Sequence, residues 1–585
     1  MSKVAGDNKE TDRPIDPDID KTINEIESLF EDFGDIVKKK FRLKRKGGER
    51  YIYITYIDGL ADNEMVERTI THPLLYEWRE VEGDTCPSCD SWKKDGKTDA
   101  GDIEKKDGGA ACAVGKRERD TATCATDKRN GKTAAGADEK KSDSITAHEK
   151  ADGIDKGEMS PKKDWDFSRI FYDEAEAVDM TEAVSVREAV DGILNGDTAV
   201  FIDGQDKAII LSTKNYPVRS LGSPEKESGL KGPRDAFNEN LRTNTALLRR
   251  RIKDTGMKLE QDVIGVRSKT AYGLMYMEEL CEPELLIKIR EKLDSFKIDG
   301  IFDSSMLVHL LEDKWYSPFP QVQTTERPDK AASAILEGRV VMVVDNSSEV
   351  IIFPATFNTF FQAADDYYNR FAVATFARFI RYVAAYMAVL LPGLYVAVTC
   401  FYPQVLPTDF LLAIVAARND VTFPVVVEVL LMEFLFELLR EAGIRLPGQL
   451  GNTMGVVGGL IVGQAAVDAS LVSTIVVIVV ALTALCSFAI PNEEFASTFR
   501  LLKFVMIIMG AVLGLYGIML AILVIQIHLA SLESFGIPYM MPLVSGSVDD
   551  GVEYQDFLLR KPVFSMRQRP VYTRYGRRRR FLRRR

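Results

Sequence analysis

Residues 193–203 read ILNGDTAVFID, and residues 335–345 read ILEGRVVMVVD, 142 positions further along the chain. Each copy is typical of a helix end with glycine just beyond it, then a strand, a turn at aspartate and a second strand, AIIL or VIIF. Residues 56–66 and 276–286 repeat another pattern, at an offset of 220. The repeats therefore predict two related α/β subdomains.

The two offsets differ by 78, which is also the length of residues 84–161. This segment has five Ile, Val or Met and neither Leu nor Phe, so its composition predicts a disordered insertion in the first copy. Four cysteines in the insertion leave a zinc site open, although their spacing matches no standard paired zinc knuckle. They are Cys86, Cys89, Cys112 and Cys124.

The fold class that we expect is an α/β cytosolic region of two related subdomains followed by an α-helical multi-span membrane domain. At the N-terminus, apolar residues at helical spacing predict an amphipathic helix that ends in the lysines at 38–40. The parts are residues 1–42, a polar segment and this helix; 43–215, the first subdomain with its insertion; 216–261, a connecting helical linker; 262–370, the second subdomain and the approach to the membrane; 371–543, the membrane domain; and 544–585, a basic cytoplasmic tail.

Apolar runs of nearly 20 residues in the second half of the chain predict membrane crossings. The candidates are residues 380–402, 451–467, 471–490 and 503–528. Residues 423–440 are apolar but carry several carboxylates. We favour four crossings, because a fifth would place the basic tail opposite the cytosolic half, against the positive-inside rule. Residues 423–440 would then lie in the interface, re-enter the bilayer, or line a water-filled cavity.

The charge of the chain is segregated. The whole chain carries −11, whereas residues 560–585 hold twelve Lys or Arg and no acidic residue. Next to membrane spans, the favoured partner of such a tail is anionic lipid rather than nucleic acid. The first thirty residues lack a signal peptide, so we expect the N-terminal half to be cytosolic and the protein to be a multi-pass membrane protein.

Small and polar residues in the apolar half are the candidate functional residues. Glycines at four-residue spacing allow close helix packing, either within the chain or between subunits. They are Gly455, Gly459, Gly463, Gly510 and Gly514. Carboxylates and amides at membrane depth usually face a cavity, a pore or another polar group, although a helix-end or interfacial position stays open for each. The candidate pore or gating residues are Glu428, Glu433, Glu437, Gln464 and Asp468.

The sequence contains no phosphate-binding loop, metalloprotease motif, nucleophile elbow or dinucleotide fingerprint in a strand-to-helix context. We therefore expect neither an enzyme nor a cofactor. Arg327 stands in TERPD, residues 325–329. The motif suits a helix start with a local charge arrangement between Glu326 and Arg327, and the alternative is a contact between Arg327 and a neighbouring subunit.

Several motifs resemble the A subunit of the GerA-type spore germinant receptors. They are SPFPQ at 317–321, TERPD at 325–329, DDYYNR at 365–370, LREAGIRLP at 439–447, GVVGGLIVGQAAVDASLVS at 455–473 and VALTALCSF at 480–488. The resemblance runs from about residue 193 to 542 and is weaker over 20–80. The insertion and the basic tail depart from the family pattern.

The resemblance implies a nutrient receptor of the spore inner membrane or the bacterial cell membrane, assembled with a transporter-like B subunit that binds the germinant and a lipoprotein C subunit. It also implies that the A subunit forms an oligomeric, cation-conducting channel. Two alternatives stay open: a secondary transporter, whose substrate site would lie at broken helices near the midplane, and a membrane scaffold for cytosolic partners.

Overall fold

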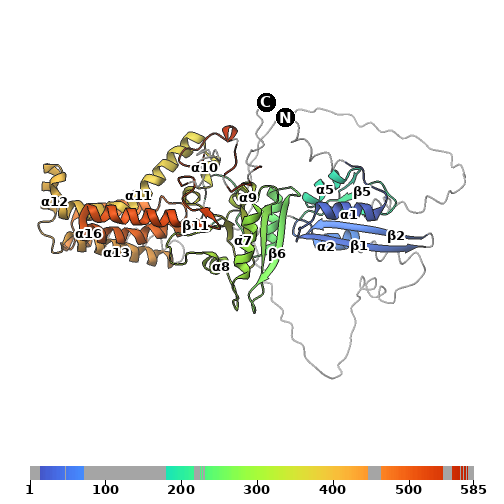
Figure 1. The fold of residues 1–585 in the computed structure, drawn as a ribbon, viewed down its shortest axis with the longest axis horizontal. Helices are drawn as coiled ribbons and strands as arrows, with labels where there is room; N and C mark the ends of the chain where they lie inside the picture. The colour runs from blue at the N-terminus through green and yellow to red at the C-terminus, as the bar shows by residue number, and fades with distance from the viewer. Residues whose placement is uncertain are drawn as a thin grey trace, which may run out of the picture. The chain divides into compact units, whose positions relative to one another are not determined.

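The computed structural model of the chain describes residues 13–45, 48–71, 179–215, 231–445, 463–544 and 556–566, with residues 224, 227, 229, 568–570, 572–574 and 576. The predicted insertion with its cysteines, Gly455, Gly459 and the arginines from residue 577 onward lie outside these residues. The described residues form two α/β subdomains, a helical bundle and a C-terminal tail (Figure 1).

The first subdomain is an antiparallel five-stranded sheet in the order β1-β2-β4-β5-β3. Two helices, α1 and α5, pack their apolar residues on it. The elements are α1 Ile19–Leu29, β1 Ile36–Arg45, β2 Gly48–Ile57, α2 Asn63–Val66, a π-helical turn Glu67–Thr71, β3 Met180–Ala183, α5 Val186–Leu194, β4 Thr198–Ile202 and β5 Ala208–Leu211.

The second subdomain repeats this order as β6-β7-β9-β10-β8, which is what the internal repeat predicts. Helices α7 and α8 cover one face of the sheet and α6 and α9 the other. The elements are α6 Leu241–Arg251, β6 Met257–Ile264, β7 Thr270–Met277, α7 Pro283–Asp294, α8 Ser304–Leu311, β8 Gln323–Thr325, α9 Pro328–Leu336, β9 Val340–Val344, β10 Val350–Phe353, a 3-10 turn Phe357–Phe361 and α10 Asp365–Tyr368.

The N-terminal helix is shorter than its apolar spacing predicts. It ends at Leu29, and the lysines at 38–40 lie in β1, paired with β2 over ten residues. The prediction that the N-terminal helix continues through the lysines at 38–40 was therefore wrong. Asp32 adopts a positive φ of 58°, which breaks the helix, and pairing with β2 satisfies the backbone of the following residues.

A buried ion pair joins the two subdomains. The Arg249 guanidinium, at the end of α6, donates from Nε and Nη2 to the Asp35 carboxylate at 2.8 Å each, and it stacks 3.9 Å from the Phe33 ring centroid. Beside this pair, the backbone N–H of Gly34 donates to the Leu259 carbonyl on the edge strand β6. The loop between α1 and β1 therefore extends the second sheet.

The remaining helices pack as a bundle, in which α13 and α16 lie along one another (Figure 1). They are α11 Phe371–Phe401, a 3-10 turn Pro403–Val405, α12 Thr408–Ala417, α13 Val425–Arg445, α15 Thr474–Ser487 and α16 Glu493–Ser531, followed by short strands β11 Glu533–Ser534 and β12 Ile537–Pro538. By length and composition, α11 and α16 could each cross a bilayer. The predicted crossing at 451–467 lies largely outside the described residues.

Helix α16 reverses its direction at Gly514, which has φ 60° and ψ −139°. In a straight helix, Phe499 and His528 would lie about 43 Å apart at 1.5 Å per residue. Instead, both rings lie within 6.5 Å of the Phe319 ring centroid. Residues 503–528, predicted as one crossing, therefore belong to a helical hairpin with a closed end at Gly514 and an open end at Phe319. A hydropathy window reports apolarity and not backbone direction, so it missed the reversal.

The bundle depends on close backbone contact between α11 and α16. A Cβ atom added to Gly510 would lie 2.7 Å from the carbonyl oxygen of Gly393, and one added to Gly393 would lie 2.7 Å from that of Met506. Only glycine permits such an approach. Gly510, singled out by its spacing, thus packs within the chain, whereas a Cβ on Gly463 would meet only Val477 at 3.9 Å.

We expect Gly510→Ala to lower the free energy of unfolding of the detergent-purified chain by about 1–3 kcal/mol, because the new methyl group must displace a backbone carbonyl. Gly463→Ala is the matched control and should leave the unfolding temperature unchanged or slightly raised. Equal unfolding temperatures for the two variants would contradict this packing.

Candidate functional site

A lysine holds two of the candidate carboxylates inside the bundle. Lys503 of α16 is 3% exposed, and its Nζ lies 2.7 Å from Glu433 Oε2 and 2.8 Å from Glu437 Oε1, both on α13. Glu433 is 1% exposed. A buried charge is tolerated only where a partner neutralises it. The polar group that Glu433 and Glu437 face is therefore Lys503. The sequence of residues 423–440 could not identify it, because Lys503 lies on another helix.

The ion pairs continue towards the open end of the hairpin. Arg500 pairs with Glu437 at 3.8 Å and with Glu493 at 3.2 Å, and Arg440 also pairs with Glu493. Three carboxylates and three cationic groups therefore alternate between α13 and α16. We call these six residues the charge ladder: Glu433, Glu437, Arg440, Glu493, Arg500 and Lys503.

Glu428 lies near the other end of α13 and is fully buried. Its Oε1 accepts from the Arg418 guanidinium at 3.1 Å, and its Oε2 accepts from the backbone N–H of Ser473 at 3.0 Å. Ser473 is the N-cap of α15, where the helix leaves its first N–H groups unpaired. Glu428 thus joins α13 to the residue after α12 and to the start of α15.

Gln464 and Asp468 differ from the three glutamates because both are exposed on the chain. The Gln464 amide donates to Asp468 Oδ1 at 2.8 Å, one helical turn away. Among the five candidates, these two therefore present polar atoms on the outer surface of the bundle.

Arg327 lies inside the second subdomain and is 2% exposed. Its guanidinium pairs with the Asp329 carboxylate at 2.9 and 3.1 Å and donates to the carbonyls of Glu227 and Pro233. Burial opposes ionisation of Asp329, but hydrogen bonds from Arg327 and Tyr368 outweigh it and lower the pKa of Asp329. A side chain so enclosed offers no surface to another subunit, so the structure favours the helix-start interpretation, with Asp329 rather than Glu326 as the partner.

A pocket of about 170 Å³ lies beside this cluster, between α9 and α10. Its charged lining is matched within the chain, because Lys330 pairs with Glu227 and Arg339 donates to Gln323 and to the Pro354 carbonyl. Burial lowers the pKa of Arg339. Both cationic side chains of the pocket lining are therefore held by groups of this chain.

The C-terminal tail returns to the second subdomain, which sequence reasoning missed. Arg569 Nε donates to the Leu336 carbonyl, and Thr573 Oγ1 to the Glu337 carbonyl at 2.7 Å, so both satisfy the C-terminal end of α9. Tyr572 Oη lies 2.7 Å from Thr356 Oγ1. The described part of the tail thus lies against the second subdomain. Basic composition alone carried no signal for these contacts.

The beginning of the tail fastens the start of α11. Arg560 is buried and donates to the backbone carbonyls of Asp366, Tyr367 and Asn369 at the end of α10. Asp556 Oδ1 lies 2.6 Å from Arg378 of α11. The motif at 365–370, one of those that carry the family resemblance, is therefore where the tail, α10 and α11 meet.

Comparisons with known proteins agree on one family. A family model described as Bacillus/Clostridium GerA spore germination protein matches residues 138–572. Spore germination protein KA of Bacillus subtilis (strain 168) is 42% identical over 378 residues, covering 65% of this chain and 69% of that protein. Spore germination protein A1 of the same strain is 42% identical over 365 residues, covering 62% and 76%.

Two further matches extend these findings. Spore germination protein GerLA of Bacillus cereus is 36% identical over 385 residues, covering 66% of this chain and 78% of that protein. The crystal structure of the N-terminal domain of the A subunit of the Bacillus megaterium spore germinant receptor GerK3 is 20% identical, with a TM-score of 0.36. It covers 59% of this chain and 98% of that domain.

Lys503→Met should lower the free energy of unfolding by about 3–5 kcal/mol, because it leaves Glu433 buried without a countercharge. Thermal unfolding of the detergent-purified chain measures the change. Adding Glu433→Gln and Glu437→Gln should recover much of the lost stability. The control Glu441→Gln removes only an exposed pair with Arg445 and should change stability by less than about 0.5 kcal/mol. An unchanged Lys503→Met variant would refute the structural role of the charge ladder.

Arg327→Ala should destabilise the whole chain by about 3–5 kcal/mol, because it leaves Asp329 buried and unpaired. Arg327→Ala combined with Asp329→Asn should be more stable than the single variant. The comparison requires only thermal unfolding of the three proteins. If Arg327→Ala instead unfolds normally but assembles less well, the interpretation as a subunit contact is correct.

Proposed function

Since the chain belongs to the GerA family of spore germination proteins, we propose that it is a membrane subunit of a nutrient germinant receptor that triggers spore germination. The observation that carries this proposal is the family match over residues 138–572, which includes both the second α/β subdomain and the bundle. The bundle would cross the spore inner membrane, with the α/β subdomains and the tail on its cytosolic side.

In this proposal, the chain works with a transporter-like B subunit and a lipoprotein C subunit, and the B subunit binds the germinant. In the described part of the bundle, the buried Glu428 and Glu433 are paired within this chain, and the cationic side chains of the pocket beside α9 are held by groups of this chain. Both observations support a subunit that responds to a germinant bound elsewhere.

We assign the two groups of candidate polar residues to different roles in a cation channel built from several copies. A pore-lining residue must be polar and exposed on the single chain, which favours Gln464 and Asp468. In a symmetric oligomer, Asp468 becomes a ring of like charges, which raises the local cation concentration and excludes anions.

The buried glutamates suit gating rather than conduction. Glu428 joins α13 to α15, and the charge ladder joins α13 to the hairpin. Ion pairs between two helices have one matched register, so a sliding movement must break several of them together. Opening the channel would shift α13 against α16 and exchange these partners.

In this proposal, the second α/β subdomain drives such a shift through its contacts with the hairpin. Phe319, in the SPFPQ motif, lies at the open end of the hairpin, where it packs against Phe495 and Phe499 of the first arm and against His528 of the second. Thr498 also donates to the Pro318 carbonyl. A movement of the second subdomain would therefore reach both arms of the hairpin.

Asp468→Asn should lower the cation-to-anion permeability ratio of the receptor reconstituted in liposomes, because it removes the charge of the ring while keeping its shape. Glu441→Gln removes an exposed carboxylate elsewhere on the bundle and serves as the control. The ratio is obtained from the reversal potential in a salt gradient.

The same preparation separates the alternatives. Conductance with an unchanged permeability ratio would leave the channel in place and remove Asp468 from its pore. Saturable uptake of a solute without conductance would support a secondary transporter. Neither uptake nor conductance, with normal assembly, would support a scaffold.

A further inference from the structure

Residues 314–319 form a loop of the second α/β subdomain that contacts the open end of the hairpin. Lys314 Nζ donates to the Ser531 carbonyl at the end of α16, and Ser317 Oγ lies 2.9 Å from His528 Nε2. A cation at the C-terminal end of a helix is favoured by the helix dipole. These contacts hold the loop in a defined position against the end of the helix.

Two aromatic side chains of this loop are left outside. Trp315 is 83% exposed and Tyr316 is 61% exposed, and their rings meet edge to face with centroids 6.1 Å apart. The Tyr316 ring also lies 6.2 Å from the His528 ring. Aromatic side chains as exposed as these leave apolar surface in contact with water unless lipid or another protein covers it.

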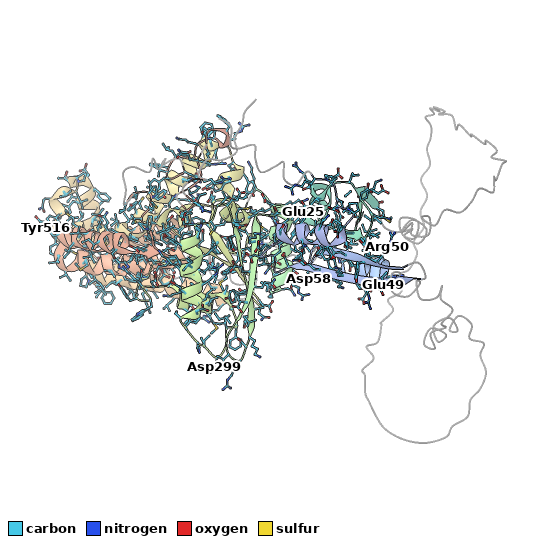
Figure 2. All side chains as sticks on the ribbon, turned by 45° about the vertical axis from the view of Figure 1, so that its right-hand side comes forward. Glu25, Glu49, Arg50, Asp58, Asp299 and Tyr516 are labelled. Carbon is cyan, nitrogen blue, oxygen red and sulfur yellow. The ribbon has the colours of Figure 1, made fainter. Side chains whose placement is uncertain are left out.

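The exposed face of α16 leads towards this loop. Its apolar stripe consists of Met519, Leu520, Leu523, Val524 and Ile527, all exposed. Ile527 is the last of these and precedes His528, which Tyr316 contacts. At the other end of the stripe stands Tyr516, 74% exposed near the closed end of the hairpin, where it is labelled in Figure 2.

An apolar stripe with aromatic residues at both ends is the arrangement that lipid bilayers favour. Tyr and Trp collect at the two membrane–water interfaces, because the ring is apolar and its O–H or N–H finds hydrogen bonds among the headgroups. From Tyr516 to Ser531 the helix rises about 22 Å, which approaches the thickness of the hydrocarbon core. The loop residues then fall where the headgroups begin.

We infer that Trp315 and Tyr316 insert into the lipid headgroup layer on the cytosolic side, so that the second α/β subdomain binds the membrane surface through this loop. The inference rests on the proposed membrane placement of the bundle. The occupant of this surface is the headgroup region of a phospholipid bilayer, and the recognition is by the amphipathic ring rather than by headgroup charge.

The test measures the depth of Trp315 in the full chain reconstituted in phosphatidylcholine vesicles. The chain has four tryptophans, and replacing Trp78, Trp92 and Trp165 by Phe leaves Trp315 as the sole emitter. Vesicles carry lipids brominated either near the headgroup end or near the methyl end of the acyl chains, because bromine quenches a tryptophan that it contacts. We expect a larger loss of Trp315 emission with the shallow bromines.

Two variants that also carry Trp315→Phe calibrate the measurement. Leu523→Trp places the emitter in the middle of the stripe and should lose most emission with the deep bromines. Asp299→Trp places it at an exposed loop tip of the same subdomain, labelled in Figure 2, and should lose none.

The calibration keeps the inference separate from the function on which it rests. If Leu523→Trp is quenched and Trp315 is not, the loop does not reach lipid and the inference is overturned while the membrane bundle stands. If Leu523→Trp is not quenched either, the membrane placement of the bundle fails and the inference fails with it. Trp315 quenched more by deep than by shallow bromines would also overturn a headgroup position.

Discussion

The reversal of α16 at Gly514 is the constraint on which the rest of the bundle depends. Its backbone lies at φ 60° and ψ −139°, where a side chain is strained, so the turn requires glycine. Because the hairpin closes there, Phe495 and His528 return to the same loop of the α/β subdomain. The open end also brings Glu493 beside Arg440, so that α13 is fastened where the hairpin begins. Without the reversal, neither connection could form in one chain.

The charges of the bundle show why apolar helices can carry so many ionisable groups. An unpaired charge is costly in lipid. In this bundle, carboxylates of α13 pair with cationic side chains of α16. Glu428 follows the same rule with Arg418, but it also satisfies the N-terminal end of α15. Pairing of this kind costs desolvation and adds little net stability, so its main effect is to define one register between helices.

Sequence patterns predicted the local secondary structure, but they did not predict which side chains pair with residues far away in the sequence. The repeated strands and the glycines at 196 and 338 could be predicted, because alternation, turn residues and a positive φ are properties of a few adjacent residues. The partner of Glu433 is Lys503, 70 positions away, and that of Asp35 is Arg249, 214 positions away. No periodicity links such residues. The lysines at 38–40 misled the helix prediction because strand pairing with β2 outweighed local spacing.

The tail contacts have a consequence for the order in which the chain matures. Thr573 caps a carbonyl at Glu337, 236 residues earlier in the chain. At about 5–20 residues per second, a ribosome needs on the order of 10 to 50 s between these two positions. During that interval the end of α9 stands uncapped while the bundle is being delivered to the membrane. The nascent second subdomain thus completes its native contacts only after the last helix has been released, so any chain that terminates early leaves α9 and α10 unfinished.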